Sequence, residues 1–151
     1  MRLILLLLLL TLSSAPAVSQ TTSIDSVKQV VDAMFTFMKN ADSAAMSSLF
    51  TADAQLQTVV VSKEGVTSVR SQRIQEFITM VGQLPKGDAD ERIRFDAVHI
   101  DGALASVWTP YQFYYKGNFS HCGVNSFQLV RIKGAWKIHF IIDTRRKAGC
   151  D

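Results

Sequence analysis

Apolar and polar residues recur with two different periods along the chain. Over residues 23–38, isoleucine, valine, methionine and phenylalanine recur three and four positions apart, which is the spacing of one helix face. Asn40-Ala41-Asp42 interrupts this pattern, and Asp42 is a suitable N-cap for a short second helix over residues 43–50. A third helix is predicted over residues 72–84, where Pro85 ends it. The pattern therefore predicts three helices with apolar faces.

The remaining segments are typical of strands. Residues 54–61 and 66–71 are rich in β-branched residues and predict a first, short hairpin. A polar loop over residues 85–91 then precedes four longer strands. These strands are expected over residues 92–100, 103–115, 126–132 and 135–142.

Turn residues separate the longer strands. Asp101-Gly102 and Lys133-Gly134 predict two-residue hairpins, and residues 116–118 form a further turn. Pro110 cannot donate a backbone hydrogen bond, so we expect a bulge or bend there. Helices on one face of such a sheet predict an α+β, cone-shaped fold, with three N-terminal helices packed on a curved antiparallel sheet.

The turn at residues 133–134 fixes the pairing of the last two strands, and so which side chains share a face. The predicted interior set is Phe127, Leu129, Trp136, Ile138 and Phe140. His139 then points outward. Continued along the strands, the same alternation places Asn125 and Ile142 inward and Asp143 and Arg145 outward, unless a bulge shifts the register near the strand end.

The N-terminal segment predicts a targeting signal. Arg2 precedes an apolar run over residues 3–12, and Ala17-Val18-Ser19 follows, which is the layout of a secretory signal peptide over residues 1–19. The run is shorter than the roughly 20 apolar residues that cross a bilayer. We therefore expect cleavage between Ser19 and Gln20. Residues 20–151 should then form a single exported domain, periplasmic or secreted and not embedded in a membrane.

Charge and cysteine content narrow the picture further. The formal net charge is +3, and basic residues are scattered except at residues 145–147, so we expect no nucleic-acid partner. Cys122 and Cys150 lie in the exported part, where thiols tend to oxidise. They predict a disulfide worth roughly 3–4 kcal/mol, and two unpaired cysteines are the alternative.

The C-terminal third resembles a known superfamily. Its marks are Pro110-Tyr111, Ser120-His121-Cys122-Gly123, Trp136-Lys137-Ile138 and Asp143-Thr144-Arg145-Arg146. Together with the order of elements, they are similar to the nuclear transport factor 2-like superfamily, within it the exported bacterial proteins grouped as "putative lumazine-binding" or SnoaL-like. The resemblance implies a cavity between the helices and the concave sheet, and a homodimer formed through the convex face. Because this fold hosts isomerases, dehydratases, cyclases, binding proteins and dimerisation modules, it does not select a function.

Two titratable residues are candidates for catalysis. His121, beside Ser120 and near Tyr111 or Tyr115, could act as a general acid or base, or could hold a strand end by hydrogen bonds. Asp143 could accept a proton, or could form a salt bridge with Arg145. Asp53 lies where the resemblance implies that the pocket opens, and is otherwise a turn residue.

Aromatic side chains form the predicted ligand-binding set. Trp108, Tyr111, Phe113 and Tyr115 alternate along one strand, apart from the disturbance at Pro110. They could stack on a small apolar or aromatic ligand, or fill the core. Ser120, His121 and Asn125 complete the predicted pocket.

No signature of a metal or cofactor site is visible in the sequence. His99, His121 and His139 share no ligand spacing, so we expect no metal. The chain has neither a glycine-rich phosphate loop nor a nucleophile elbow, and we expect no cofactor.

Three functional hypotheses follow. The first is an exported small-molecule-binding domain. The second is an enzyme of the isomerase, dehydratase or cyclase type that uses His121 or Asp143. The third is a ligand-free structural dimer, in which Phe127, Phe140 and Trp136 would fill a collapsed cavity.

Overall fold

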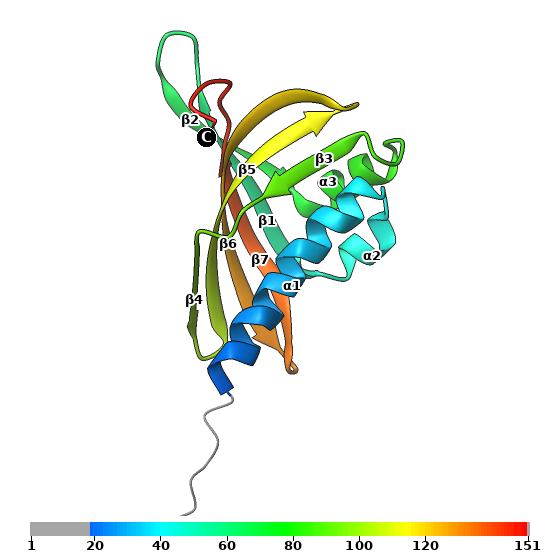
Figure 1. The fold of residues 1–151 in the computed structure, drawn as a ribbon, viewed down its shortest axis with the longest axis vertical. Coiled ribbons are helices and arrows are strands. Elements are labelled where there is room, and N and C mark those ends of the chain that lie inside the picture. The colour runs from blue at the N-terminus through cyan, green and yellow to red at the C-terminus, as the bar shows by residue number, and fades with distance from the viewer. Residues whose placement is uncertain (1–18, 151) are drawn as a thin grey trace, which may run out of the picture.

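The computed structural model describes residues 19–150, so the predicted signal peptide, apart from Ser19, lies outside the described residues. Within these described residues, three helices and seven strands follow one another (Figure 1). In chain order they are α1 (Ser19–Lys39), α2 (Ser43–Ser47), β1 (Phe50–Val61), β2 (Thr67–Arg73), α3 (Ile74–Gly82), β3 (Ala89–Ile93), β4 (Ala97–Asp101), β5 (Leu104–Tyr115), β6 (Asn118–Ile132) and β7 (Ala135–Thr144).

The three predicted helices are confirmed, and each buries the face that its apolar spacing indicates. On α1, Val27 and Val31 are fully buried. The Asp42 carboxylate caps α2 by accepting a hydrogen bond from the Ala45 N–H at 2.9 Å. On α3, the buried residues are Ile74, Ile78 and Val81. No helix in residues 19–150 is long and apolar enough to cross a membrane.

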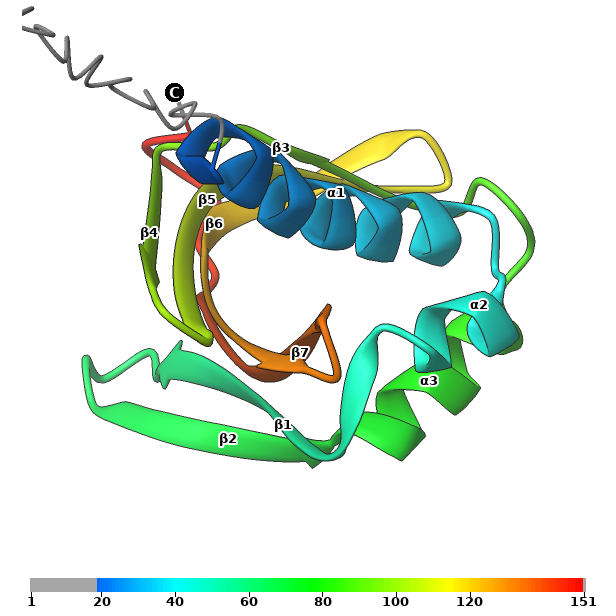
Figure 2. The ribbon, with the colours of Figure 1, turned by 90° about the horizontal axis from the view of Figure 1, so that it is seen from below.

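The strands form one curved sheet in the order β2-β1-β7-β6-β5-β3, with β4 also paired to β5 (Figure 2). Helix α1 contacts β3, β4 and β7, and α3 contacts β1 and β2, so the helices cover the concave side. This is the predicted cone-shaped α+β fold, with one difference. β1 pairs with β7 in parallel, so the sheet is mixed and not wholly antiparallel.

The predicted strand over residues 92–100 is in fact two strands. β3 begins at Ala89, inside the predicted polar loop, and the pairing with β5 is interrupted at residues 94–96. The interruption lies opposite Pro110, whose carbonyl oxygen accepts a hydrogen bond from the Arg94 N–H at 3.0 Å. The backbone amide that proline lacks falls at this gap, so pairing with β6 continues through Pro110. The irregularity expected at Pro110 lies on the opposite side, where residues 94–96 stand opposite only residues 109–110 and the register shifts by one residue. The irregularity between β5 and β6 lies at Ser120 instead.

The β6–β7 register is as predicted near the turn and changes further along. Leu129 pairs with Ile138, but Gln128 then pairs with Phe140, which leaves His139 as the extra residue of a bulge. The bulge reverses the alternation beyond it, since one inserted residue moves every following side chain to the other face. The interior placement of Phe140 and Ile142 is therefore wrong, as is the outward placement of Asp143, which is buried.

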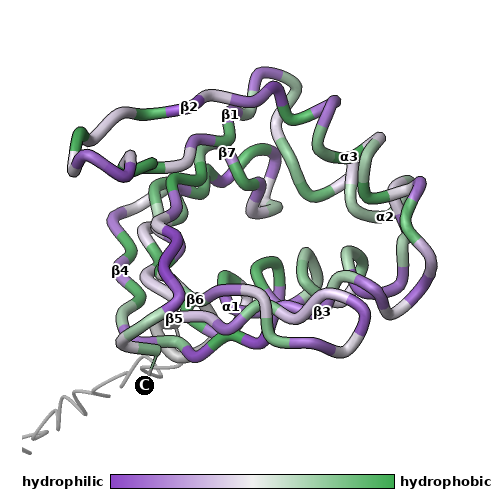
Figure 3. Tube along the Cα trace, turned by 90° about the horizontal axis from the view of Figure 1, so that it is seen from above, coloured by the Kyte–Doolittle hydropathy of each residue, from purple (hydrophilic) through white to green (hydrophobic). Residues whose placement is uncertain are grey.

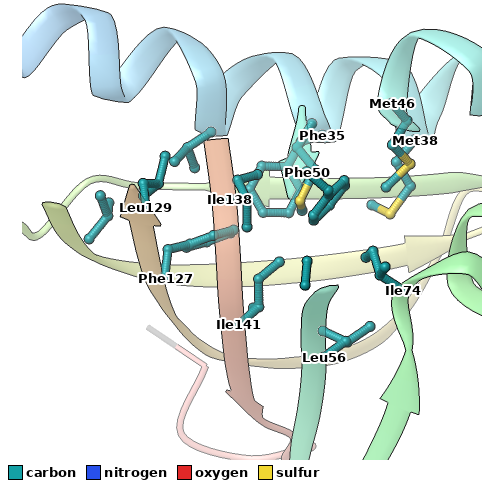
Figure 4. Close-up of a cluster of buried hydrophobic side chains, with 14 of the residues drawn as sticks. Phe35, Met38, Met46, Phe50, Leu56, Ile74, Phe127, Leu129, Ile138 and Ile141 are labelled. Atoms are coloured by element: carbon teal, nitrogen blue, oxygen red, sulfur yellow. The ribbon is translucent and has the colours of Figure 1, made fainter. Parts of the chain in front are cut away.

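A cluster of apolar side chains lies between α1 and the concave side of the sheet (Figure 4). Phe127, Leu129 and Ile138 are fully buried there. Phe35 of α1 packs edge-on against the Phe127 ring, with 6.0 Å between ring centroids. This cluster fixes how α1 lies on the sheet.

The predicted disulfide joins Cys122 of β6 to Cys150. A pair of backbone hydrogen bonds between Cys122 and Arg146, at 2.9 and 2.8 Å, holds the same segment. Gln112 adds a side-chain bond to the Cys150 carbonyl at 3.1 Å. The C-terminal segment is thus attached to β5 and β6 directly after the strand that carries Asp143.

Candidate functional site

A cavity of about 360 Å³ lies between the helices and the concave side of the sheet. The helical side and the segment after α3 contribute only apolar side chains, namely Met34, Phe35, Met38, Phe77, Met80, Val81 and Leu84. The cavity therefore has one fully apolar wall. Along the strands that face these helices, apolar and polar residues alternate (Figure 3).

The opposite wall, formed by the strands, carries the polar groups. These are Glu91, Tyr111, His121, Asn125, Asp143 and Arg145, which we call the polar wall. They come together because inward positions of neighbouring strands pair: Asn125 lies opposite both Thr109 and Asp143. The bulge at His139 brings Asp143 and Arg145 into this set.

Asp143 is held by two neighbours. Its Oδ2 accepts hydrogen bonds from Arg145 Nε at 2.8 Å and from the Tyr111 hydroxyl at 3.4 Å. Its Oδ1 is buried without a hydrogen-bond partner. The Arg145 guanidinium also reaches Thr58 Oγ1 of β1 at 3.4 Å, which ties the carboxylate to the parallel strand pair.

The Tyr111 side chain lies over Gly123 and reaches a second hydrogen-bond acceptor. Its hydroxyl donates to the Thr144 carbonyl at 2.9 Å, and its strand neighbour is Gly123. A Cβ on Gly123 would lie 1.8 Å from that carbonyl oxygen and 2.8 Å from Tyr111 Cε1, so only glycine fits. Burial raises the pKa of Tyr111, which keeps its hydroxyl protonated as a donor.

His121 lies against two aromatic rings of β5. Its ring centroid is 5.7 Å from that of Tyr111 and 5.1 Å from that of Phe113, and Nδ1 lies 3.0 Å from Ser120 Oγ. Burial lowers the pKa of His121, and the positive charges of Arg145 and Lys147 lower it further, against the opposing effect of Asp143. The imidazole is therefore mainly neutral at pH 7.

Glu91 is a cavity residue that the sequence interpretation missed, because it fell in the predicted polar loop. Its Oε1 accepts a hydrogen bond from Asn125 Nδ2 at 2.8 Å. Burial raises the pKa of the Glu91 carboxyl to about 7; the Asn125 hydrogen bond lowers this pKa, nearby Asp143 raises it and Arg145 lowers it. The spacing of Ala89, Glu91 and Ile93, every second residue, is the only signal that could have placed Glu91 on an inward strand position.

The structure separates the predicted ligand-binding set into two groups. Tyr111, Phe113, Tyr115, His121 and Asn125 line the cavity, whereas Trp108 and Ser120 do not. Trp108 is half-exposed on the outer face, because strand alternation runs unbroken through Pro110 and puts Trp108 and Tyr111 on opposite faces.

The other candidates lie elsewhere. Asp53 is exposed on β1, and its Oδ1 lies 3.7 Å from His139 Nδ1, outside the cavity. No group of three or more histidine, cysteine or acidic side chains could hold a metal ion within the part of the chain that the structure describes.

Comparisons with known proteins agree with this architecture. The chain is similar in structure to an NTF2-like protein of unknown function from Shewanella baltica, with a TM-score of 0.67 and 15% identity over 86% of this chain and 98% of that one. It is also similar to a "putative dehydratase from the NTF2-like family" from Streptomyces avermitilis, with a TM-score of 0.62 and 19% identity over 86% of this chain and 100% of that one. At these identities the likeness shows the fold alone. No curated protein matches the chain.

A match to a family model shows which family the chain belongs to. The model described as "Putative lumazine-binding" matches residues 22–139, which include β1 to β6 and every cavity-lining residue except Ile141, Asp143 and Arg145. The chain therefore belongs to the putative lumazine-binding family of the nuclear transport factor 2-like superfamily.

Proposed function

We propose that the chain is an exported small-molecule-binding domain whose ligand occupies the cavity between the helices and the curved sheet. The observation that carries this proposal is the cavity itself, which combines about 360 Å³ of space with an apolar helical side and a polar wall. Sites for small molecules are typically concave, mostly apolar and furnished with a few polar groups.

Aromatic residues favour a flat, partly aromatic ligand. Tyr111, Phe113 and Tyr115 follow one another at alternate positions of β5 and all line the cavity. Their rings offer faces and edges on which a planar ring system can pack. The family description, "Putative lumazine-binding", also favours a heterocyclic ligand.

Blocking the cavity tests the proposal. Leu84→Trp places a larger side chain in the cavity lining, whereas Leu104→Trp makes the same change at a half-exposed position outside it. A ligand at 100 times its Kd should stabilise the wild type by about 2.7 kcal/mol, a shift of several degrees in Tm. We expect thermal-shift measurements against heterocycles, flavin-like compounds, steroids and polyketides to find such a shift in the wild type and Leu104→Trp, but not in Leu84→Trp. A panel that shifts none of the three proteins would contradict the proposal.

A second candidate function is acid–base catalysis by His121 or Asp143, as an isomerase, dehydratase or cyclase. Both side chains line the cavity, and one structural relative is described as a putative dehydratase. The neutral His121 ring could accept a proton, whereas Asp143 Oδ2 is already engaged by Arg145. If turnover of a bound compound is found, it should be lost in His121→Ala; unchanged turnover in both His121→Ala and Asp143→Asn would exclude this candidate.

The ligand-free alternative has less support. It requires that Phe127, Phe140 and Trp136 fill the cavity, but Phe127 and Trp136 belong to the core cluster and do not line the cavity. Phe140 lies beyond the bulge on the outer face.

The outer face supports a homodimer. Trp108 and Ile142 both lie opposite Ser126 on this face, and Phe140 occupies the next row. A half-exposed tryptophan beside two partly buried apolar residues is typical of an interface core. Light scattering should give twice the chain mass, and a monomeric mass would contradict this part of the proposal.

Export is supported by the disulfide, because such bonds persist in oxidising compartments. We propose that residues 1–19 are removed during export to the periplasm or medium. N-terminal sequencing of the exported protein should then begin at Gln20, and a chain that retains its first 19 residues would contradict it.

A further inference from the structure

Glu91 has one hydrogen bond and one free oxygen on a side chain that lines the cavity. Oε1 accepts the Asn125 Nδ2–H at 2.8 Å, while Oε2 has no hydrogen-bond partner and Glu91 no ion-pair partner among residues 24–150. Because the Asn125 amide donates to Oε1, a proton on this carboxyl group belongs on Oε2. A protonated Glu91 therefore presents an O–H donor that no protein group uses.

Burial and the charge of Asp143 disfavour the ionised form of Glu91, and they outweigh the Asn125 hydrogen bond and the charge of Arg145, which favour it. The other polar groups of the cavity lining are Asp143 and Arg145 on the β7 side, His121 and Asn125 on β6, and Tyr111 and Tyr115 on β5, while α1 and α3 contribute only apolar side chains to it. Arg145 is engaged by Asp143 at 2.8 Å, so its charge is largely compensated. No unpaired cation of the polar wall is left for Glu91, and burial raises its pKa to about 7.

We propose that Glu91 anchors the ligand as a protonated carboxylic acid, donating a hydrogen bond through Oε2 to the carbonyl oxygen of an uncharged, largely apolar molecule. This inference rests on the proposed binding function and adds the chemical class of the ligand. A hydrogen bond to the neutral acid is lost when Glu91 ionises, so ligand affinity falls as the pH rises through 7. The cavity then releases its ligand under alkaline conditions.

Two fluorescent probes of similar size test this. Prodan is an uncharged naphthalene ketone with a carbonyl acceptor at one end, whereas N-phenyl-1-naphthylamine is uncharged and has no carbonyl. We expect the wild type to bind Prodan about 30-fold more tightly at pH 6 than at pH 8.5, since only the protonated fraction of Glu91 is competent. The affinity for N-phenyl-1-naphthylamine should change less than about twofold.

Variants assign the effect to Glu91. Glu91→Gln keeps an N–H donor and cannot ionise, so it should bind Prodan at both pH values about as tightly as the wild type does at pH 6. Glu91→Ala should bind Prodan no more tightly at pH 6 than at pH 8.5. His121→Gln removes the cavity imidazole, whose pKa burial lowers, and should retain the pH dependence.

The outcomes separate this inference from the proposed function. If the wild type binds both probes with no response to pH, or if Glu91→Gln retains the response, the role of Glu91 is refuted and the binding function stands. If neither probe binds at pH 6, the cavity is not a binding site for such molecules, and both the inference and its basis fail.

Discussion

Replacing Gly123 with alanine is expected to lower the free energy of unfolding by about 3–4 kcal/mol, near the upper end for a single overpacked residue. The new Cβ would lie 1.8 Å from the Thr144 carbonyl oxygen, which is backbone and cannot rotate away. Separating β6 from the end of β7 would also break the hydrogen bond from the Tyr111 hydroxyl to Thr144. Urea denaturation of the wild type and variant measures the difference.

A glycine in open space provides the matched control. Gly65 has a φ of 81° in the β1–β2 turn, and a Cβ there would meet nothing within 4 Å. Gly65→Ala should therefore cost only about 1 kcal/mol, from the unfavourable backbone conformation. Equal losses at the two positions would show that the close approach at Gly123 does not matter for stability.

Removing the disulfide should have an effect of similar size. The Cys122–Cys150 bond closes a loop with a sequence separation of 28, which contains β7 and most of β6. Without the bond the unfolded chain gains conformational entropy. The free energy of unfolding of the double variant Cys122→Ala/Cys150→Ser should therefore be about 3–4 kcal/mol lower than that of the wild type. For a chain of this size that corresponds to a Tm lower by roughly 10–15 °C.

A reductant supplies the internal control for this prediction. Dithiothreitol should lower the Tm of the wild type to that of the double variant and leave the variant unchanged. The bond would contribute no stability if the wild type had the same Tm with and without reductant and the variant shared that Tm.

Features set by neighbouring residues could be predicted from the sequence. The Asp42 cap and the Lys133-Gly134 turn depend on a few adjacent residues, and the structure contains both. The apolar face of α1 likewise follows from the spacing of its own residues. The helices, most strands and the fold class could therefore be predicted from the sequence.

Features set by distant segments could not be predicted. The bulge at His139 lies where β1 also departs from regular pairing, between Phe50 and Gln55, and His139 Nδ1 lies 3.0 Å from Thr51 Oγ1. A local pattern cannot show that residues 88 positions apart will meet. The side of the sheet on which Asp143 lies depends on this bulge, so only part of the polar wall could be predicted from the sequence.

Glu91 illustrates the same limit for the candidate site. Its polar neighbours Asp88 and Asp90 are typical of a loop, and its role emerges only from pairing with β5 and from Asn125, 34 residues later. A charged residue in a polar stretch gives no sign that its carboxyl group will line a cavity. Sequence patterns identified the aromatic part of the cavity better than its acidic part.

Methionine methyl groups offer the most direct test of the central claim, that a small molecule binds between the helices and the sheet. Met34, Met38 and Met80 line the cavity, whereas Met46 is fully buried outside its lining. In ¹H–¹³C spectra of methyl-labelled protein titrated with Prodan at pH 6, we expect the signals of Met34, Met38 and Met80 to shift and that of Met46 to stay in place. Saturating binding that leaves the three cavity methyls unshifted would place the ligand elsewhere and contradict the account.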